Sequence, residues 1–299
     1  MSIAVLIGVH DGLVIASDSA SALTISVEPG TVAGVANVYD NANKIFNLYK
    51  GKPIGCVTFG SGSIGNSSIG TLIKDLRFVL MSPDKEKAKA LGIEFNPNDY
   101  TMEGVSNTLA KFLGDECQKQ PLASQPNLAI GLLVGGYSTN GSLGESWHVE
   151  IQGGKALPVK QMRLPDQPGI SWGGMAEVIQ RMILGYSPAL FQVLADVSGP
   201  QEQGQVTAQQ LSAQLTPLLM QKLQAPLVFA PMPIQDAIDL GRFLVHAAIM
   251  YTRFLPGAQV VGGPIEIAAI TKHEGFKWID RKHYYEWQLN QEPRHVVVD

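Results

Sequence analysis

The chain has 299 residues, of which 45% are hydrophobic and only 16% are charged, and its formal net charge is -4. The length allows one large domain or two small ones. The low charged fraction argues against a disordered chain and favours a large core or wide buried interfaces. The acidic balance argues against a general nucleic-acid or anionic-membrane surface.

The N-terminal segment and the cysteines indicate a cytoplasmic protein. Residues 3–9 are apolar, but no Lys or Arg precedes them and Asp11 follows, so they lack the pattern of a secretory signal. No uncharged apolar stretch approaches the roughly 18 residues that a membrane span needs. The two cysteines, Cys56 and Cys117, are too few for a disulfide framework, and we expect reduced thiols.

The first part of the chain predicts two hairpins. Residues 3–9 and 13–17 are short β-branched runs on either side of His10-Asp11-Gly12, and Asp-Gly is a strong hairpin signal. Both runs are apolar on both faces, which predicts strands that are covered on both sides. Residues 19–42 are small and polar, and we expect an extended loop there. A second hairpin is expected around Gly51-Lys52-Pro53.

Helices and strands are then expected in groups. Apolar residues at helical spacing follow the glycine turn at 60–66 and recur over about 101–118, whereas residues 82–100 are strongly charged and predict a surface excursion. The later elements are expected as strands within 127–137, 145–152 and 155–162, a helix near 174–185, one at about 207–223, a long helix over 233–254 and a hairpin within 264–280.

This order predicts the fold class. Strands in runs and helices in runs favour antiparallel sheets with helices on their outer faces over a βαβ alternation. No linker and no internal repeat is evident in the sequence. We therefore predict an α+β fold, a four-layer αββα sandwich of two antiparallel sheets flanked by helices, formed by a single domain over residues 1–299.

A glycine-rich turn fits a nucleotide-binding pattern. Residues 60–65 read G-x-G-x-x-G after a strand and before a helix, as in dinucleotide-binding turns. The helix that follows leads to a charged loop and a second helix, so the βαβ context is missing. The pattern then indicates only close packing of a helix against a strand. The six histidines show no H-x-x-x-H spacing, and we expect neither a cofactor nor a metal.

The N-terminal motifs resemble a known family when they are taken together. Ser2 is followed by a strand, an Asp-Gly turn and a strand that ends in Ala16-Ser17-Asp18. Lys44-Ile45 and then Gly60-Ser61-Gly62-Ser63 come next. This order resembles the proteasome β-subunit family of N-terminal nucleophile (Ntn) hydrolases, including its bacterial proteasome-type peptidases. The resemblance covers most of the chain, with insertions near 20–40, 82–100 and 186–232 and a C-terminal extension after about 280.

The resemblance implies a role for each motif residue. After removal of Met1, Ser2 is the nucleophile, and its free α-amine handles the proton. Lys44 favours deprotonation of the hydroxyl, Asp18 holds and orients Lys44, and the Gly62 N–H faces the oxyanion. The serines at 61, 63 and 171 are candidate substrate-binding residues. Taken without the family, Asp18 and Lys44 also fit a structural ion pair, and Gly62 also fits a simple turn.

The sequence departs from the family pattern at several positions. The nucleophile is Ser2 where the family usually has Thr. Trp172 occupies the place of a mid-chain serine, which puts Ser171 one position off. Ala258 and Val261 stand where the family carries an Asp and a Ser that steady the α-amine. These departures keep a second hypothesis open, a catalytically inactive scaffold that has retained the fold.

The resemblance also implies partners. Family members assemble into rings or helical stacks, so we expect a homo-oligomer that acts on a peptide or protein substrate, with an ATP-dependent unfoldase as a candidate partner. An acyl transferase that uses the same serine is a third hypothesis. The aromatic and basic residues at 278–287 fit stacking on single-stranded nucleic acid, but in an acidic chain they fit a subunit contact better, and no nucleic-acid partner is expected.

Overall fold

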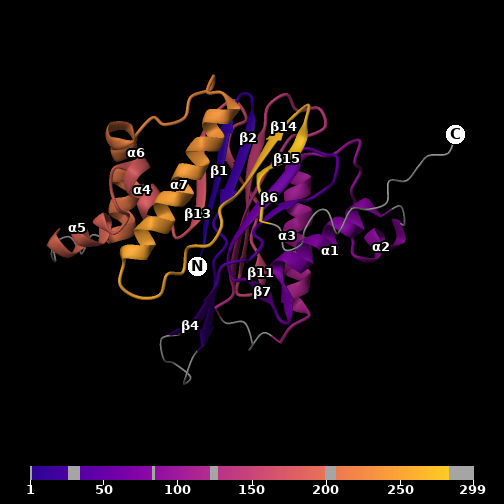
Figure 1. The fold of residues 1–299 in the computed structure, drawn as a ribbon, viewed down its shortest axis with the longest axis horizontal. Coiled ribbons are helices and arrows are strands. Elements are labelled where there is room, and N and C mark those ends of the chain that lie inside the picture. Colours follow the sequence, from indigo (N-terminus) through magenta and orange to yellow (C-terminus); the bar gives the residue numbers. More distant parts are fainter. Residues whose placement is uncertain (1, 26–33, 83–84, 122–126, 199–206, 283–299) are drawn as a thin grey trace.

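Two large antiparallel sheets and two groups of helices make up most of the structure (Figure 1). The computed structural model describes residues 2–25, 34–82, 85–121, 127–198 and 207–282. Within these ranges the protein is a mixed α/β structure with seven helices. No helix of the described ranges combines the length and the apolarity needed to cross a membrane.

The first sheet, here called sheet I, contains the N-terminal hairpin. Its strands lie in the order β13 (Gly169–Gly174), β1 (Ile3–Val9), β2 (Gly12–Ser17), β14 (Glu266–Thr271) and β15 (Gly275–Asp280), and each pairs antiparallel with its neighbours. Every residue of β1 and β2 is buried, which explains why these strands are apolar on both faces. The predicted N-terminal and C-terminal hairpins are confirmed.

The second sheet, sheet II, faces sheet I. Its strands lie in the order β11 (Lys155–Ala156), β10 (Glu145–Gln152), β9 (Ala129–Gly136), β6 (Ile54–Gly60) and β5 (Ile45–Asn47), and β12 (Lys160–Arg163) also pairs with β10. Buried side chains from both sheets form one core cluster between them, including Leu6 and Ile15 of sheet I and Val57 and Leu133 of sheet II.

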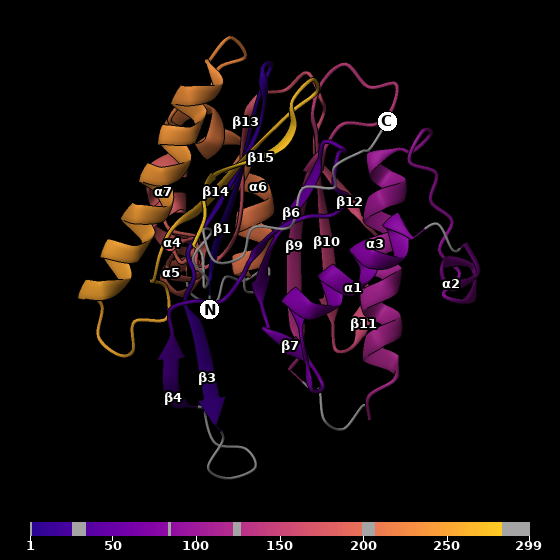
Figure 2. The same cartoon turned by 45° about the vertical axis from the view of Figure 1, so that its right-hand side comes forward.

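Helices cover the outer face of each sheet (Figure 2). Against sheet I lie α4 (Glu177–Leu184) and α7 (Ile234–Phe254), whose apolar residues share a core cluster with β1 and β2. Against sheet II lie α1 (Ile69–Met81) and α3 (Met102–Gln118), within a separate cluster. The Ser68 hydroxyl caps α1 by accepting a hydrogen bond from the Thr71 N–H, so the glycine-rich turn leads directly into a helix start.

The structure corrects two expectations about strands. Residues 19–42 include a hairpin, β3 (Ser21–Ile25) with β4 (Gly34–Tyr39), instead of only an extended loop. The strand expected over 155–162 is divided into β11 and β12, because Pro158 between them has no N–H to donate to a ladder.

The segment 186–232 contains two helices where one was expected. Helix α6 (Ala208–Leu223) matches the prediction, and it is preceded by α5 (Leu190–Ser198). The charged segment 82–100 contains a short helix, α2 (Lys85–Ala90). Two short strands, β7 (Ser63–Ile64) and β8 (Ser67–Ser68), form a small hairpin within the glycine-rich turn.

Candidate active site

A cleft of about 1220 Å³ opens beside the start of β1, the start of β5 and the end of β6. Five of the predicted site residues line it: Ser2, Lys44, Ser61, Gly62 and Ser63. They come from three separate parts of the sequence. Residues of both sheets therefore line the cleft. Motifs that are separated in the sequence meet at this one place in the fold.

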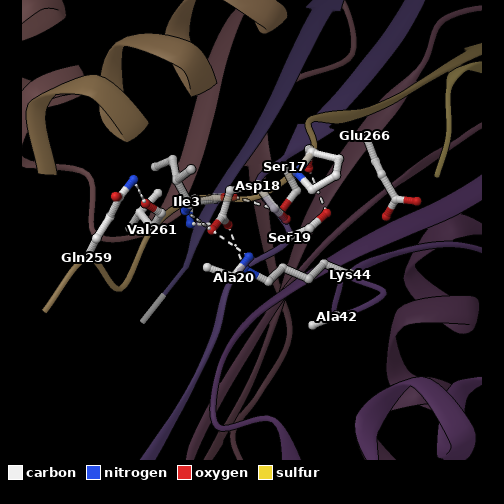
Figure 3. A network of polar contacts seen from close by, with 12 residues as sticks. Ile3, Ser17, Asp18, Ser19, Ala20, Ala42, Lys44, Gln259, Val261 and Glu266 are labelled. Carbon is white, nitrogen blue, oxygen red and sulfur yellow. Dashed lines mark hydrogen bonds and ion pairs between the residues drawn. The ribbon is translucent and has the colours of Figure 1, made fainter. Parts of the chain in front are cut away.

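Asp18 lies directly behind this cleft at the end of β2, and its side chain is fully buried. Its Oδ1 accepts hydrogen bonds from Lys44 Nζ at 2.6 Å and from the Ile3 N–H at 3.0 Å. Its Oδ2 accepts from the N–H groups of Ala20 at 3.2 Å and Gly262 at 3.0 Å (Figure 3). Four donors from four chain segments thus hold one carboxylate and fix its position.

Lys44 immediately precedes β5, and its backbone carbonyl accepts a hydrogen bond from the Thr58 N–H on β6. The side chain is 5% exposed. Burial lowers the pKa of the Lys44 amine and outweighs the Asp18 carboxylate, which acts to raise it. Lys44 is therefore fixed in position and gives up a proton more readily than a lysine on the surface.

Ser2 precedes β1 and is 6% exposed. Its backbone carbonyl accepts a hydrogen bond from the Met175 N–H at 2.8 Å. Gly174 has a φ of 84°, and a Cβ there would collide with the Ser2 carbonyl, so only glycine fits beside it. The hydrogen bond from Ile3 to Asp18 fixes the next residue, and Ser2 is thus held from both sides at the cleft wall.

Two glycines of the turn after β6 have different surroundings. Gly60 has a φ of 90°, and a Cβ there would collide with the Ala129 carbonyl. A Cβ on Gly62 would meet only Ser21 Oγ, at 3.6 Å. The Gly62 carbonyl accepts from the Ile69 N–H, whereas its own N–H donates to no group in the described residues. An N–H that lines a cleft and lacks a partner can receive an oxyanion.

The structure does not give the turn a dinucleotide-binding context. The helix after Gly65 is α1, and every strand pairing of the described residues is antiparallel. No βαβ unit with a parallel strand is therefore formed in this part of the chain.

Ser171 lies elsewhere. It is buried on β13 opposite Leu6, its hydroxyl accepts a hydrogen bond from Arg163 at 3.0 Å, and it is not among the described residues that line the cleft. Burial lowers the pKa of Arg163 to about 10. Trp172 packs against the core cluster between sheet I and its helices. Ser171 and Trp172 of β13 thus contribute to packing at this position.

Several residues of the site were not predicted. Ser21 and Thr58 line the cleft, and Gly262 supplies a hydrogen bond to Asp18 from the segment where Ala258 and Val261 replace the expected polar residues. Glu266 is buried near the Asp18–Lys44 pair, and it is the only charged residue of the run PIEIAAIT. A single carboxylate in a buried apolar strand is a signal that the sequence offers, because an ionised group is rarely buried without a partner.

A metal site, a reactive thiol and a nucleic-acid contact have less support in the described residues. These residues contain no group of three or more His, Cys, Asp or Glu side chains arranged to hold a metal ion. Cys56 is fully buried, and burial raises the pKa of its thiol, which keeps it unreactive. Of the aromatic and basic segment, Trp278 stacks with Arg281, whereas Tyr284, Tyr285 and Trp287 lie outside the described residues.

The fold is similar to that of a known protein. No protein-family model matches the sequence, and no curated protein is similar to it in sequence. A solved structure, Anbu (ancestral beta-subunit) from Yersinia bercovieri, has a similar fold with a TM-score of 0.52 and 14% sequence identity. The similarity covers 95% of this chain and 89% of that chain. At this identity the chain shares a proteasome-like fold, and the roles of its residues must be argued from their own geometry.

Proposed function

We propose that the protein is an N-terminal nucleophile hydrolase that cleaves peptide or other amide bonds through an acyl-enzyme on Ser2. The observation that carries this proposal is the position of the Asp18 carboxylate. It binds Lys44 Nζ and the Ile3 N–H with the same oxygen, and it thereby places a buried amine and the start of β1 at one wall of the cleft. The proposal requires that Met1 is removed.

The proposed reaction uses groups that line this cleft. The neutral Lys44 amine accepts the Ser2 hydroxyl proton as Oγ attacks the carbonyl carbon of the scissile amide. The Gly62 N–H stabilises the oxyanion, and the α-amine of Ser2 relays the proton to the leaving nitrogen as the C–N bond breaks. Water then attacks the ester on Ser2, which releases the acid and restores the hydroxyl. Asp18 stays ionised and orients Lys44 throughout.

The arrangement of the two sheets and their flanking helices fits the same proposal. We propose that the two sheets and their flanking helices form the four-layer αββα sandwich of Ntn hydrolases, as one domain over residues 1–299. The supporting observation is the separation of three core clusters, one between the sheets and one under each helical group. The segments 20–40, 82–100 and 186–232 are then insertions into that domain.

We further propose a cytoplasmic homo-oligomer. Apolar side chains are exposed on the helices outside sheet I, with Val197 of α5 at 80%, Leu218 of α6 at 51% and Phe254 of α7 at 77%. Helix α6 has no buried residue within the chain. Exposed apolar surface of this kind is typical of protein contacts, and a second copy is the expected occupant.

An inactive scaffold is the second candidate function. It is favoured by Ala258 and Val261, which cannot supply the hydrogen bonds that the family pattern places beside the α-amine. In the described residues, the Gly262 N–H from this segment is directed to Asp18. The scaffold would keep the buried Asp18–Lys44 pair for stability alone.

Covalent labelling distinguishes the two functions. A β-lactone acylates an activated serine, so the wild-type protein is expected to gain the mass of one probe molecule. The Ser2→Ala variant should gain none, whereas Ser171→Ala, which removes a buried serine outside the cleft, should be labelled like the wild type. Labelling that persists in Ser2→Ala excludes Ser2 as the nucleophile.

A further inference from the structure

A second buried ion pair lies behind the Asp18–Lys44 pair. Glu266 is the first residue of β14 and is 2% exposed, and its Oε2 lies 2.6 Å from Nζ of Lys282, whose side chain is 12% exposed. This oxygen accepts no hydrogen bond from any described residue, and its contact with Lys282 is an ion pair only. A buried carboxylate without a partner is costly, so Lys282 is the cation that compensates it.

Lys282 also connects the two segments that carry the catalytic pair. Besides its ion pair, its ammonium group donates to the Ser19 hydroxyl at 2.9 Å and to the Ala42 carbonyl at 2.8 Å. The ammonium group therefore makes two hydrogen bonds besides its ion pair with Glu266. Ser19 follows Asp18 directly, and Ala42 lies two residues before Lys44.

The segments held by Lys282 also contact each other. The Ala42 N–H donates to the Ser19 carbonyl at 2.9 Å, and the Ser19 hydroxyl donates to the Pro264 carbonyl at 2.7 Å. Figure 3 shows Ser19, Ala42 and Glu266 beside Asp18 and Lys44. The described residues thus form two adjacent ion pairs with compensating charges, linked through one hydroxyl and a short stretch of backbone.

The charges of the second pair also act on Lys44. Lys282 contributes to lowering the pKa of the Lys44 amine and Glu266 acts to raise it, and both effects are smaller than those of burial and of Asp18. The charged groups of the described residues that act on Lys44 are therefore Asp18 after β2, Glu266 on β14 and Lys282 after β15.

We propose that Lys282 and Glu266 are positioning residues of the Ser2 site, which hold the segments of Asp18 and Lys44 from behind and set the electrostatic field at the Lys44 amine. The inference rests on the proposed function for its consequence at Ser2. It assigns a role within the subunit to Lys282, which belongs to the aromatic and basic segment for which the sequence favoured a subunit contact. Lys282 and Glu266 act on the Lys44 amine in opposite directions. Removing one charge at a time therefore distinguishes an electrostatic role of the pair from a purely structural one.

The test is a pH titration of Lys44 by NMR in the full chain labelled with 13C at the lysine Cε. The Lys44→Arg variant, which lacks the corresponding signal, assigns it. In Lys282→Met the remaining Glu266 carboxylate should shift the Lys44 midpoint to higher pH, and in Glu266→Gln the remaining Lys282 ammonium should shift it to lower pH. Each shift should be about half a pH unit, smaller than the roughly 1–3 units caused by a directly paired charge.

Two further variants complete the design. Lys282→Arg keeps the cation and should leave the midpoint close to that of the wild type. The double variant Lys282→Met with Glu266→Gln removes both charges and should return the midpoint toward the wild-type value. If Lys282→Met does not fold because its buried carboxylate is uncompensated, Glu266→Gln still decides. An unchanged midpoint in Glu266→Gln, or shifts of the same sign in both single variants, overturns the proposal.

Reactivity provides a separate readout. The pH at which β-lactone labelling of Ser2 reaches half its maximal rate should move in the same direction as the Lys44 midpoint in each variant. Absence of labelling in the wild type contradicts the proposed function but leaves the NMR titration to decide the role of the pair. Labelling whose pH dependence is the same in all variants overturns the proposed effect on Ser2.

Discussion

The opposite ends of strand β1 each lie beside a cation whose pKa is lowered by burial, and the two cations are neutralised differently. At the start of the strand, Lys44 donates to the Asp18 carboxylate, which also binds the Ile3 N–H. Near its end, Arg163 lies close to Gly8 and donates to the Ser171 hydroxyl, and no ion pair with a described carboxylate compensates it. One cation is ion-paired beside an open cleft, and the other is packed among neutral groups.

Lys44 is buried and Arg163 is partly exposed, but the chemical identity of each group decides what it can do. Burial lowers the pKa of both groups, and for Arg163 the value falls only to about 10. A guanidinium with this pKa remains charged at neutral pH, whereas a lysine starts from a lower value and can release its proton. At the cleft end of β1 a buried titratable amine and the Ser2 residue line the same cleft, which makes that end the candidate for catalysis.

The largest expected effect concerns stability at the two ends. Asp18→Asn removes the charge that compensates Lys44, and breaking a buried ion pair in this way costs about 3–5 kcal/mol. Ser171→Ala removes one neutral acceptor from Arg163 and should cost only about 1 kcal/mol. Urea unfolding of both variants measures the difference. Equal losses would show that the two cations are held in equivalent ways.

The second prediction concerns reactivity. Lys44→Met removes the proposed base and should slow β-lactone labelling of Ser2 by about 100-fold or more, as expected for loss of general base catalysis. Arg163→Met removes a partly buried cation at the other end of β1 and should leave the labelling rate unchanged. A labelling rate that falls equally in both variants would indicate a general effect of losing a buried cation.

A third prediction sharpens the account of the cleft end by comparing two glycines. Gly60→Ala places a Cβ against the Ala129 carbonyl at a φ of 90° and should destabilise the fold by about 1–3 kcal/mol. Gly62→Ala has free space and keeps its N–H, so its stability should change by less than about 0.5 kcal/mol. Thermal unfolding monitored by circular dichroism tests this, and a larger loss in Gly62→Ala would contradict the open position assigned to it.

The smallest expected effect is a shift in pH dependence. Because burial lowers the pKa of Lys44, its neutral form is reached at lower pH than for an exposed lysine. The labelling rate of Ser2 should therefore rise with pH and level off below the ordinary lysine value of about 10.4. Arg163→Met should leave this profile in place. A rate that is independent of pH across the range 6 to 10, taken as a rough working window, argues against a titrating base.

Local signals predicted the elements that carry the site. The Asp-Gly turn predicted the hairpin that places Asp18 beside Ile3, and the capped start of α1 followed from the glycine-rich turn. The β3–β4 hairpin was missed because its small polar residues hide the pairing, which depends on contacts between segments. The order of motifs that resembles the family singled out Ser2, Lys44 and Gly62, and all three line the same cleft.

The contacts between distant segments could not be predicted in this way. The hydrogen bonds from Gly262 to Asp18 and from Lys282 to Ser19 join residues that are far apart in the chain. Local spacing carries no information about such pairs, because they form only when the strands of sheet I pair. The position of Ser171 depends likewise on its pairing with β1 and on Arg163.

The central claim is that Ser2 is an N-terminal nucleophile held by the Asp18–Lys44 pair. Tandem mass spectrometry of the N-terminal peptide, from protein purified after reaction with a β-lactone, tests it most directly. The account predicts a peptide that begins at Ser2, without Met1, and carries the probe on the Ser2 side chain. A peptide that retains Met1, or a probe attached to any other residue, would contradict it.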